Sequence, residues 1–239
     1  MKRFADLHLY PPVEKENLTR IFNKYAKLGY DLVGVSLPIN VTKSRIQQLR
    51  RIGHHEGLDL ATRLDLVPRS VQDLTYILRK TRYKFEIISV TCVSKPVSRQ
   101  AAKDRRVDLI SYRPYSRDRF FDISTAKFAS EALAAFEVNM APLLYEKGIR
   151  RAKVISNLRR EVRTARKFNL RIVISSGSTN EYSIRTPQDF AALSTLFDLT
   201  PQQSLKAISE VPIDLIERNR KKQSQEYIAP GIHLRKEKI

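Results

Sequence analysis

The feature that most constrains the fold is a recurrence of strand-like and helix-like segments along most of the chain. Apolar runs rich in Val, Ile and Leu alternate with polar, helix-forming stretches, and successive runs begin roughly 25 residues apart. The runs begin near Phe4, Asp31, Leu58, Phe85, Asp108, Leu133 and Arg171, and the sixth extends to Leu144. Repeated strand–helix units build parallel sheets, and seven of them predict an α/β fold of the TIM-like β/α barrel type. A doubly wound sheet is the alternative, but no glycine-rich phosphate loop follows the first strand.

The last quarter of the chain breaks this alternation and predicts extra C-terminal helices. Thr186-Pro187-Gln188-Asp189 and Thr200-Pro201-Gln202-Gln203 each combine a capping Thr with Pro at the first helical position. Pro212 opens a further turn, and no clear eighth strand follows. We therefore expect one barrel domain over residues 1–222. Residues 223–239 show no periodicity and are expected to form a mobile basic tail.

Charge is the feature of composition that bears most on function. The 239 residues include 44 Lys and Arg against 25 Asp and Glu, a net charge of +19. A polyanionic partner would relieve this self-repulsion, and nucleic acid is the leading candidate. Membrane association is not expected, because no apolar run approaches the roughly 20 residues of a bilayer-spanning helix. A single cysteine and the absence of an N-terminal signal-peptide pattern favour the reducing cytoplasm.

Polar side chains alternate with apolar ones along three of the predicted strands. Residues two apart share a face of a strand, which pairs Asp6 with His8, Arg63 with Asp65, and Glu137 with Asn139. The opposite faces are apolar and should pack against the outer helices; they carry Ala5, Leu7 and Leu9, then Thr62, Leu64 and Leu66, and then Phe136, Val138 and Met140. The polar sets should then point into the barrel. We predict that Arg63 is buried there, paired with at least one of Asp6, Asp65 and Glu137.

Such a polar interior is either a working active site or an ion-pair network in its place. The Asp6-Leu7-His8 strand resembles the first motif of the polymerase-and-histidinol-phosphatase barrels, whose second metal-binding His is replaced here by Tyr10. The other histidines, His54, His55 and His233, lie away from the strand ends. We therefore expect no catalytic residue and no bound metal, with Asp6 and His8 as vestiges of a metal site.

The positive charge is concentrated in two segments. Between Arg150 and Lys167 eight basic residues accompany one acid, Glu161. Helical spacing buries Ile155, Leu158, Val162 and Ala165 and leaves three arginines on an adjacent stripe: Arg159, Arg163 and Arg166. Like charges in such a row disfavour an isolated helix, so the row is interpreted as a surface that contacts RNA phosphates. A solvated helix face is the alternative.

The second basic segment runs from Lys95 to Arg119, with Tyr112 and Tyr115 interleaved. Aromatic side chains beside cations suit unstacked bases, although these tyrosines could equally be packing residues. The candidate RNA contacts in this segment are Arg99, Arg105, Arg113 and Arg117.

A third candidate is the small-residue loop at Ser175 and Ser176. Its backbone N–H groups could hold an anion next to Arg185.

Several stretches together resemble the archaeal and eukaryotic ribonuclease P protein family that is called component 3 in archaea. They are NMAPLLY at 139–145, the basic helix that follows, RIVISSGS at 171–178, IRTPQD at 184–189 and TPQQSLKAIS at 200–209. The resemblance is densest over residues 133–220. It implies a barrel with a degenerate metal site.

In function, the resemblance implies an accessory subunit of a ribonucleoprotein, whose RNA removes the 5′ leader from precursor tRNA and holds the Mg²⁺. The implied partners are ribonuclease P RNA, precursor tRNA, other protein subunits, and protein component 2 in a heterotetramer of two copies each. Arg185 and the Ser175-Ser176 loop are implied to share a functional surface.

Two other functions remain open at this point. A metal-dependent phosphoesterase on the same barrel would explain Asp6-Leu7-His8 but not the charge. An unrelated ribosomal or DNA-compacting protein would explain the charge but not the barrel.

Overall fold

A parallel sheet of seven strands forms the centre of the molecule. The computed structural model describes residues 2–12, 14–115, 120–224, 227–229 and 232–233. The strands are β1 Ala5–Leu9, β2 Leu32–Ser36, β3 Asp59–Leu66, β4 Ile87–Thr91, β5 Leu109–Ser111, β6 Ala135–Asn139 and β7 Arg171–Ser175. They pair in sequence order, all parallel. A doubly wound sheet would reverse its strand order at a switch point, so this order confirms the barrel.

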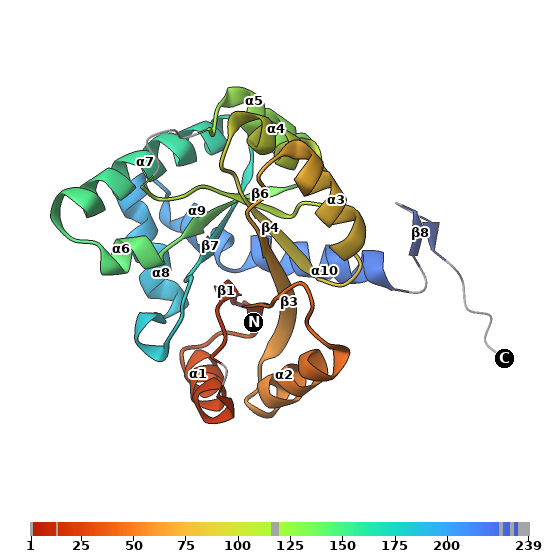
Figure 1. The fold of residues 1–239 in the computed structure, drawn as a ribbon. Helices are drawn as coiled ribbons and strands as arrows, with labels where there is room; N and C mark the ends of the chain where they lie inside the picture. The colour runs from red at the N-terminus through yellow and green to blue at the C-terminus, as the bar shows by residue number, and fades with distance from the viewer. Residues whose placement is uncertain (1, 13, 116–119, 225–226, 230–231, 234–239) are drawn as a thin grey trace.

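Helices surround the sheet on its outer side (Figure 1). They are α1 Lys15–Lys27, α2 Lys43–His55, α3 Val71–Thr81, α4 Lys95–Lys103, α5 Ile123–Glu131, α6 Ala141–Tyr145 and α7 Gly148–Lys167. Most begin at a capping side chain: Thr42, Ser70, Ser94 and Asp122 each accept a backbone N–H of the following turn. None of the helices in the described part of the chain is both long and apolar enough to cross a membrane.

The barrel closes between its first and last strands through a loop. Leu9 at the end of β1 forms an isolated bridge with Ser178, and the Tyr10 N–H donates to the Ser178 carbonyl over 2.8 Å. The loop after β7 therefore completes the wall where an eighth strand would stand.

The sixth predicted strand is shorter than its apolar run. It ends at Asn139 instead of continuing to Leu144, and residues 141–145 form α6. The Asn139 side chain accepts the Ala141 N–H over 2.9 Å, and Pro142 has no N–H with which to extend a sheet. The strand prediction was wrong over this stretch because apolar character alone does not separate a strand from a short buried helix.

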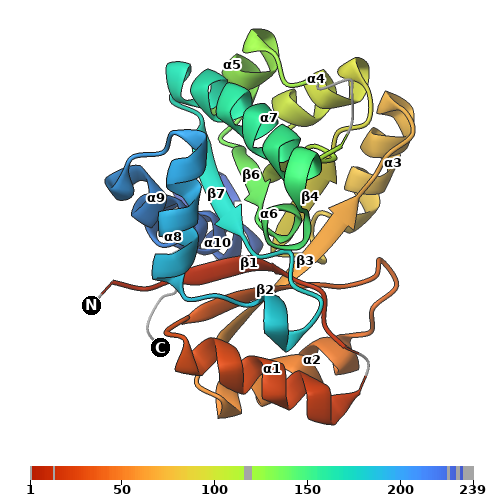
Figure 2. The same cartoon turned by 90° about the vertical axis from the view of Figure 1, so that its left-hand side faces the viewer.

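The predicted C-terminal helices are confirmed as α8 Pro187–Ser194, α9 Pro201–Ala207 and α10 Glu210–Gln223. Thr186 and Thr200 both make complete capping boxes, with Asp189 and Gln203 respectively. Short 3-10 helices, η1 Glu181–Ser183 and η2 Thr195–Phe197, connect these elements. Figure 2 shows α8, α9 and α10 grouped beside β1 and β7.

Helix α10 covers the end of the barrel where the strands begin. Ile213, Leu215 and Ile216 join an apolar cluster whose other members come mainly from the first residues of the strands: Ala5, Leu7, Leu32, Ala61, Ile87, Leu109, Ala135 and Val173. The buried Asn219 amide donates to the Glu86 carbonyl and to Asp108, each over 2.8 Å. With this end sealed, the C-terminal ends of the strands form the barrel's accessible mouth.

The last residues differ in part from the predicted tail. Helix α10 reaches Gln223, and β8 Tyr227–Ala229 pairs antiparallel with β9 Ile232–His233. Residues 225–226, 230–231 and 234–239 lie outside the described residues. The mobility expected for 223–239 stays a prediction.

Candidate functional site

The interior of the barrel carries a buried ion-pair network centred on Arg63. This side chain is 1% exposed. It meets Glu137 with both terminal nitrogens, at 2.5 and 2.7 Å, and Asp65 through Nε and Nη2, at 2.9 and 2.7 Å. Nη1 also donates to the Leu7 carbonyl over 2.9 Å. All five N–H donors of the guanidinium are thereby used, and the predicted burial and pairing of Arg63 are confirmed.

The network keeps its carboxylates ionised. Burial alone would raise the pKa of Asp65, but the charge of Arg63 outweighs burial and lowers this pKa to about 2. Burial likewise acts to raise the pKa of Glu137, and Arg63 again reverses the direction. The pKa of Arg63 is in turn raised, because the two carboxylates outweigh the effect of its burial. The result is one positive and two negative charges fixed inside the barrel.

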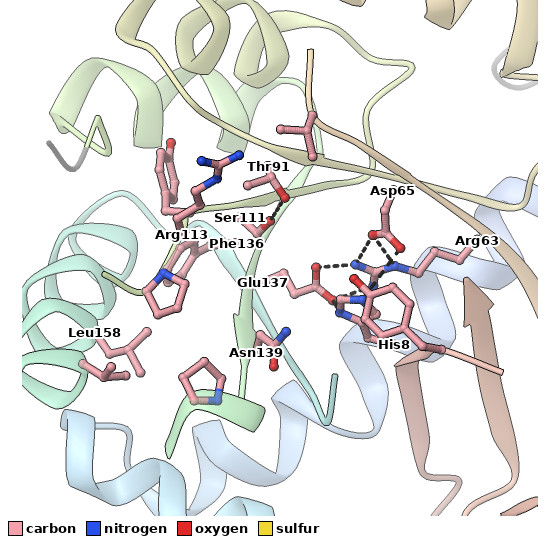
Figure 3. Close-up of a pocket in the computed structure, with 16 residues that line it drawn as sticks. His8, Arg63, Asp65, Thr91, Ser111, Arg113, Phe136, Glu137, Asn139 and Leu158 are labelled. Carbon is pink, nitrogen blue, oxygen red and sulfur yellow. Dashed lines mark hydrogen bonds and ion pairs between the residues drawn. The ribbon is translucent and has the colours of Figure 1, made fainter. Parts of the chain in front are cut away.

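His8 lies against this network without joining it. Its Nδ1 is 3.6 Å from Glu137 Oε1 and its Nε2 is 3.7 Å from Asp65 Oδ2, and neither nitrogen makes a hydrogen bond. The residue is only 5% exposed. Burial, followed by the positive charge of Arg63, lowers the pKa of His8, so its ring is neutral near pH 7. Figure 3 shows His8 next to the Arg63 guanidinium, which lies between Asp65 and Glu137.

Asp6 does not face the barrel interior, and the prediction that it shares a face with His8 was wrong. In the β1–β2 pairing Asp6 lies opposite Val33 and Leu9 opposite Val35, so β1 holds one extra residue. This bulge interrupts the alternation of faces. Ala5 and Leu7 lie in the apolar cluster under the barrel, although both were expected to face the helices.

The Asp6 carboxylate instead binds three donors on the outer side of β1. It accepts the Tyr25 hydroxyl of α1 over 2.7 Å, the Ser176 N–H over 3.0 Å and the His8 N–H over 3.1 Å. Asp6 and His8 therefore do not converge on a common ligand.

The carboxylates of the network do not fit a metal ion either. Glu137 accepts two bonds from Arg63 and one each from the Ser89 and Ser175 hydroxyls, which occupies its lone pairs. Among the described residues, no group of three or more His, Cys, Asp or Glu side chains is placed to hold a metal. The guanidinium of Arg63 stands where a cation would have to lie between Asp65 and Glu137.

A cavity of about 290 Å³ opens beside the network at the mouth of the barrel. It is lined by His8, Tyr10, Arg63, Asp65, Val67, Thr91, Ser111, Tyr112, Arg113, Pro114, Phe136, Glu137, Asn139, Pro142, Val154 and Leu158 (Figure 3). Of the predicted RNA-binding residues that the structure describes, Arg113 alone lines this cavity. Sequence reasoning missed the cavity as a site, although the polar residues that end three neighbouring strands, Thr91, Ser111 and Asn139, were a usable signal.

The arginine row of α7 is exposed, as predicted, but a carboxylate of the same chain, that of Asp198, lies against it. Arg159 and Arg163 lie 3.4 and 3.9 Å from the Asp198 carboxylate, and Arg166 donates to the Asp198 carbonyl over 2.8 Å. Arg163 nevertheless keeps 80% of its side chain exposed. Glu161 is buried and so lies off this stripe. On the inner side, Val154 is buried and Ile155 only half-buried, which corrects the predicted face by one residue.

The second basic segment places its candidate arginines in different surroundings. Arg99 donates to Asp122 over 3.3 Å, Arg105 and Arg113 are exposed, and Arg117 lies outside the described residues. Tyr112 packs against Phe121 and Phe136, so it is mainly a packing residue.

Ser175 and Ser176 do not form a surface anion site, and this prediction was wrong. Both are buried. The Ser176 N–H is used by Asp6, and the Ser178 N–H by the Ser176 hydroxyl over 3.0 Å. Arg185 donates to the carbonyls of Tyr182 and Ile184 at the end of η1, over 2.6 and 3.0 Å. The loop thus binds an anion of the chain itself, the Asp6 carboxylate.

Comparison with known proteins identifies the family of this chain. A sequence profile described as RNase P subunit p30 matches residues 3–224. The ribonuclease P protein component 3 of Methanosarcina barkeri is 30% identical over 219 residues, covering 91% of this chain and 90% of that protein. That of Methanosarcina acetivorans is 29% identical over 179 residues, covering 75% and 74%.

The fold is shared as well. A chain in a cryo-EM structure of archaeal ribonuclease P with mature tRNA superposes with a TM-score of 0.84 at 23% identity, covering 98% of this chain and 99% of that one. The chain belongs to the RNase P subunit p30 family, the protein subunits of ribonuclease P.

Proposed function

We propose that this chain is an RNA-binding accessory subunit of ribonuclease P, which supports a catalytic RNA in removing the 5′ leader from precursor tRNA. The observation that carries the proposal is family membership over residues 3–224, on a chain with a net charge of +19. Ribonuclease P RNA and precursor tRNA are the polyanions that this charge would meet. The cytoplasm is the location that goes with such a role.

The exposed arginine row of α7 is the part of the surface that supports RNA binding most directly. Each guanidinium that contacts a phosphate releases condensed counter-ions, which favours association at low salt. Asp198 neutralises only part of the row. Its single carboxylate faces both Arg159 and Arg163, whereas Arg166 donates to its backbone carbonyl. In the free protein, all three side chains contact Asp198. On RNA, the phosphates would compete with it.

The residues of the barrel interior support the assignment of catalysis to the RNA. The Arg63 charge repels a divalent cation, and Glu137 has no lone pair to offer one. We therefore propose that Mg²⁺ serves the RNA and that this chain binds no cofactor. The alternative of a metal-dependent phosphoesterase has only the Asp6-Leu7-His8 motif in its favour.

Protein component 2 of ribonuclease P is the proposed protein partner, in a complex of two copies of each chain, together with the other subunits. Sedimentation of the purified pair tests this stoichiometry. A mass of one copy each, or separate sedimentation, would contradict it.

Reconstitution tests the function itself. Cognate ribonuclease P RNA is assayed for cleavage of precursor tRNA at limiting Mg²⁺, with and without this chain and its protein partners. We expect the chain to raise the cleavage rate with the RNA present and to give no cleavage without it. Cleavage by the protein alone that is lost in His8→Ala would instead establish a protein enzyme.

A further inference from the structure

Two arginines meet one buried carboxylate at the end of the barrel that α10 seals. Arg82 and Arg218 each donate to the Asp108 carboxylate over 3.0 Å, and the Asp108 side chain is 1% exposed. Arg82 follows α3 and Arg218 lies on α10, so this carboxylate joins the two helices. Asp108 also accepts the Asn219 amide and the Ile88 N–H, so its oxygens are fully engaged within the protein.

Two further cations lie beside these arginines. Lys222 follows Arg218 by four residues on α10, which places it one turn further along the same face of the helix. Burial and the charge of Arg218 lower the pKa of Lys222, and Asp108 only partly offsets them. The charges of Arg82 and Arg105 lower this pKa further, so both side chains also lie close to Lys222. Four positive charges therefore gather around one negative charge.

The two added cations keep their charge available to a ligand. Arg105 is exposed and Lys222 is half-exposed, and neither side chain forms an ion pair with any residue that the structure describes. The carboxylate next to Arg105 in the sequence, that of Asp104, accepts Arg106 over 2.7 and 2.8 Å instead. An anion that binds between Arg105 and Lys222 therefore displaces no internal partner.

An exposed aromatic side chain stands next to these cations. Tyr83 lies between Arg82 and Lys84 in the turn after α3 and is 85% exposed. The Gln223 amide at the end of α10 donates to the Phe85 carbonyl over 2.7 Å, which holds α10 against this turn. Aromatic rings beside cations are the usual surface for unpaired RNA, because every base can stack on them.

This surface is separate from the arginine row of α7. In Figure 1, α3 and the C-terminal end of α10 lie on the right of the barrel and α7 lies on the left. The turn to Figure 2 brings α7 to the front, which agrees with this placement. The two surfaces can therefore contact different segments of one large RNA.

We propose that Arg105 and Lys222 bind phosphates of a second RNA segment and that Tyr83 stacks on one of its unpaired bases. These three residues, with Arg82 and Arg218 beneath them, form the α3–α10 basic surface. The proposal rests on the proposed function, because it names a second contact of the same RNA-binding subunit. RNA is favoured over an acidic protein segment because it supplies both the phosphates and the bases that this surface suits.

The salt dependence of binding to cognate ribonuclease P RNA tests the phosphate contacts. Each lost contact lowers the slope of log affinity against log salt by roughly 0.7–0.9. The variant Arg105→Gln, Lys222→Gln should therefore flatten the slope by about one to two units. Lys27→Gln, Lys43→Gln, exposed on α1 and α2, is the matched control and should keep the wild-type slope.

Substitution of Tyr83 tests the stacking contact by itself. Tyr83→Ala should weaken RNA binding by about tenfold and leave the salt slope unchanged, because it removes a contact without charge. Tyr83→Phe keeps the ring and should bind as wild type. Tyr182→Ala removes a ring that is 76% exposed after β7 and is the matched control, so it should also bind as wild type.

A tethered probe shows directly whether RNA lies against this surface. Cys92, the single cysteine of the chain, is buried, so a Lys84→Cys variant can carry an iron–EDTA group at one position. We expect its hydroxyl radicals to cleave one segment of the bound RNA, and the same group on Lys27→Cys to give no specific cleavage. Intact RNA with Lys84→Cys, alongside cleavage with Arg160→Cys on α7, would overturn the proposal.

The outcomes distinguish this proposal from the proposed function. Wild-type affinity and slope in Arg105→Gln, Lys222→Gln and in Tyr83→Ala, alongside weakened binding in α7 variants, would overturn the α3–α10 basic surface and keep the RNA-binding subunit. Unchanged RNA binding with lost binding of a ribonuclease P protein subunit would also overturn it and make the surface a protein-docking site. Absence of RNA binding by the wild-type protein and its partners would overturn both claims.

Discussion

Arg63 on β3 and Glu137 on β6 form a two-point ion pair across the barrel, with N–O distances of 2.5 and 2.7 Å. Each side chain is about 1% exposed at the pair, so neither charge has water to replace its partner. This pair ties together strands that are not neighbours in the sheet. The polar interior therefore links opposite sides of the barrel through a buried ion pair.

Arg63→Met should cost about 3–5 kcal/mol of unfolding free energy, because it leaves the buried Glu137 and the partly buried Asp65 without their counter-charge. Chemical denaturation measures the loss. The companion variant Arg63→Met with Asp65→Asn and Glu137→Gln should recover part of it, since it removes the stranded charges. If Arg63→Met alone were as stable as wild type, the described role of the ion pair in the barrel interior would be contradicted.

The neutral, buried His8 predicts a specific dependence of stability on pH. The folded-state pKa of His8 lies below the unfolded value of 6.5. Between these two pKa values His8 is therefore protonated mainly in the unfolded chain. Its contribution to stability is complete above pH 6.5 and is lost as the pH falls toward the folded pKa.

In His8→Gln, the decline in stability below pH 6.5 should be shallower than in wild type, by up to about 1.4 kcal/mol per pH unit. Denaturation between pH 7 and 5 measures it, above the range in which Asp65 titrates. Ser111→Ala alters the same cavity without removing a titratable group and should keep the wild-type slope. Parallel curves for wild type and His8→Gln would show that His8 is not held neutral.

The hydrogen bonds of Asp6 predict that two substitutions lower the stability by different amounts. Asp6→Ala leaves three donors without their acceptor and should cost about 3 kcal/mol or more, whereas Tyr25→Phe removes one donor and should cost about 1.5–3 kcal/mol. Thermal unfolding compares them. If Tyr25→Phe were the more damaging, Asp6 would not be the centre of the network.

The apolar face of α10 predicts that this helix belongs to the barrel core. Ile216→Ala should cost about 2–5 kcal/mol, because the side chain is buried against the first residues of the strands. Val211→Ala, at a half-buried position on the same helix, should cost clearly less. Deletion of residues 225–239 should leave the melting temperature unchanged; a large drop would place the tail in the domain.

The strand–helix rhythm and the face sharing of Arg63 with Asp65 were sufficient to predict the barrel and its buried ion pair. Both depend on local periodicity, which the sequence displays directly. Asp6 was misplaced because a single-residue bulge reverses a face without altering the apolar and polar alternation of the strand. No residue in the sequence of β1 indicates where the extra residue lies.

Contacts between distant segments account for the other failures. Small residues at Ser175 and Ser176 suit an anion loop and a buried turn equally well, and the anion that fills this loop is Asp6, at the other end of the chain. The arginines of α7 meet Asp198 beyond η2, which no spacing within the helix could indicate. The cavity at the barrel mouth likewise exists only once five strand ends are brought together.

The measurement that tests the central claim most directly is the salt dependence of binding to cognate ribonuclease P RNA. Each phosphate contact adds roughly 0.7–0.9 to the slope of log affinity against log salt. The variant Arg159→Gln, Arg163→Gln, Arg166→Gln removes three exposed cations of α7 and leaves the buried Val154, Leu158, Val162 and Ala165 intact.

A charge-matched control carries Lys43→Gln, Arg51→Gln and Arg79→Gln, exposed on α2 and α3 and distant from α7 (Figure 1). The account predicts that the α7 variant flattens the slope by about two to three units and that the control changes it little. Equal slopes in wild type and the α7 variant, with lost binding to component 2, would contradict the account and make α7 a protein-docking face.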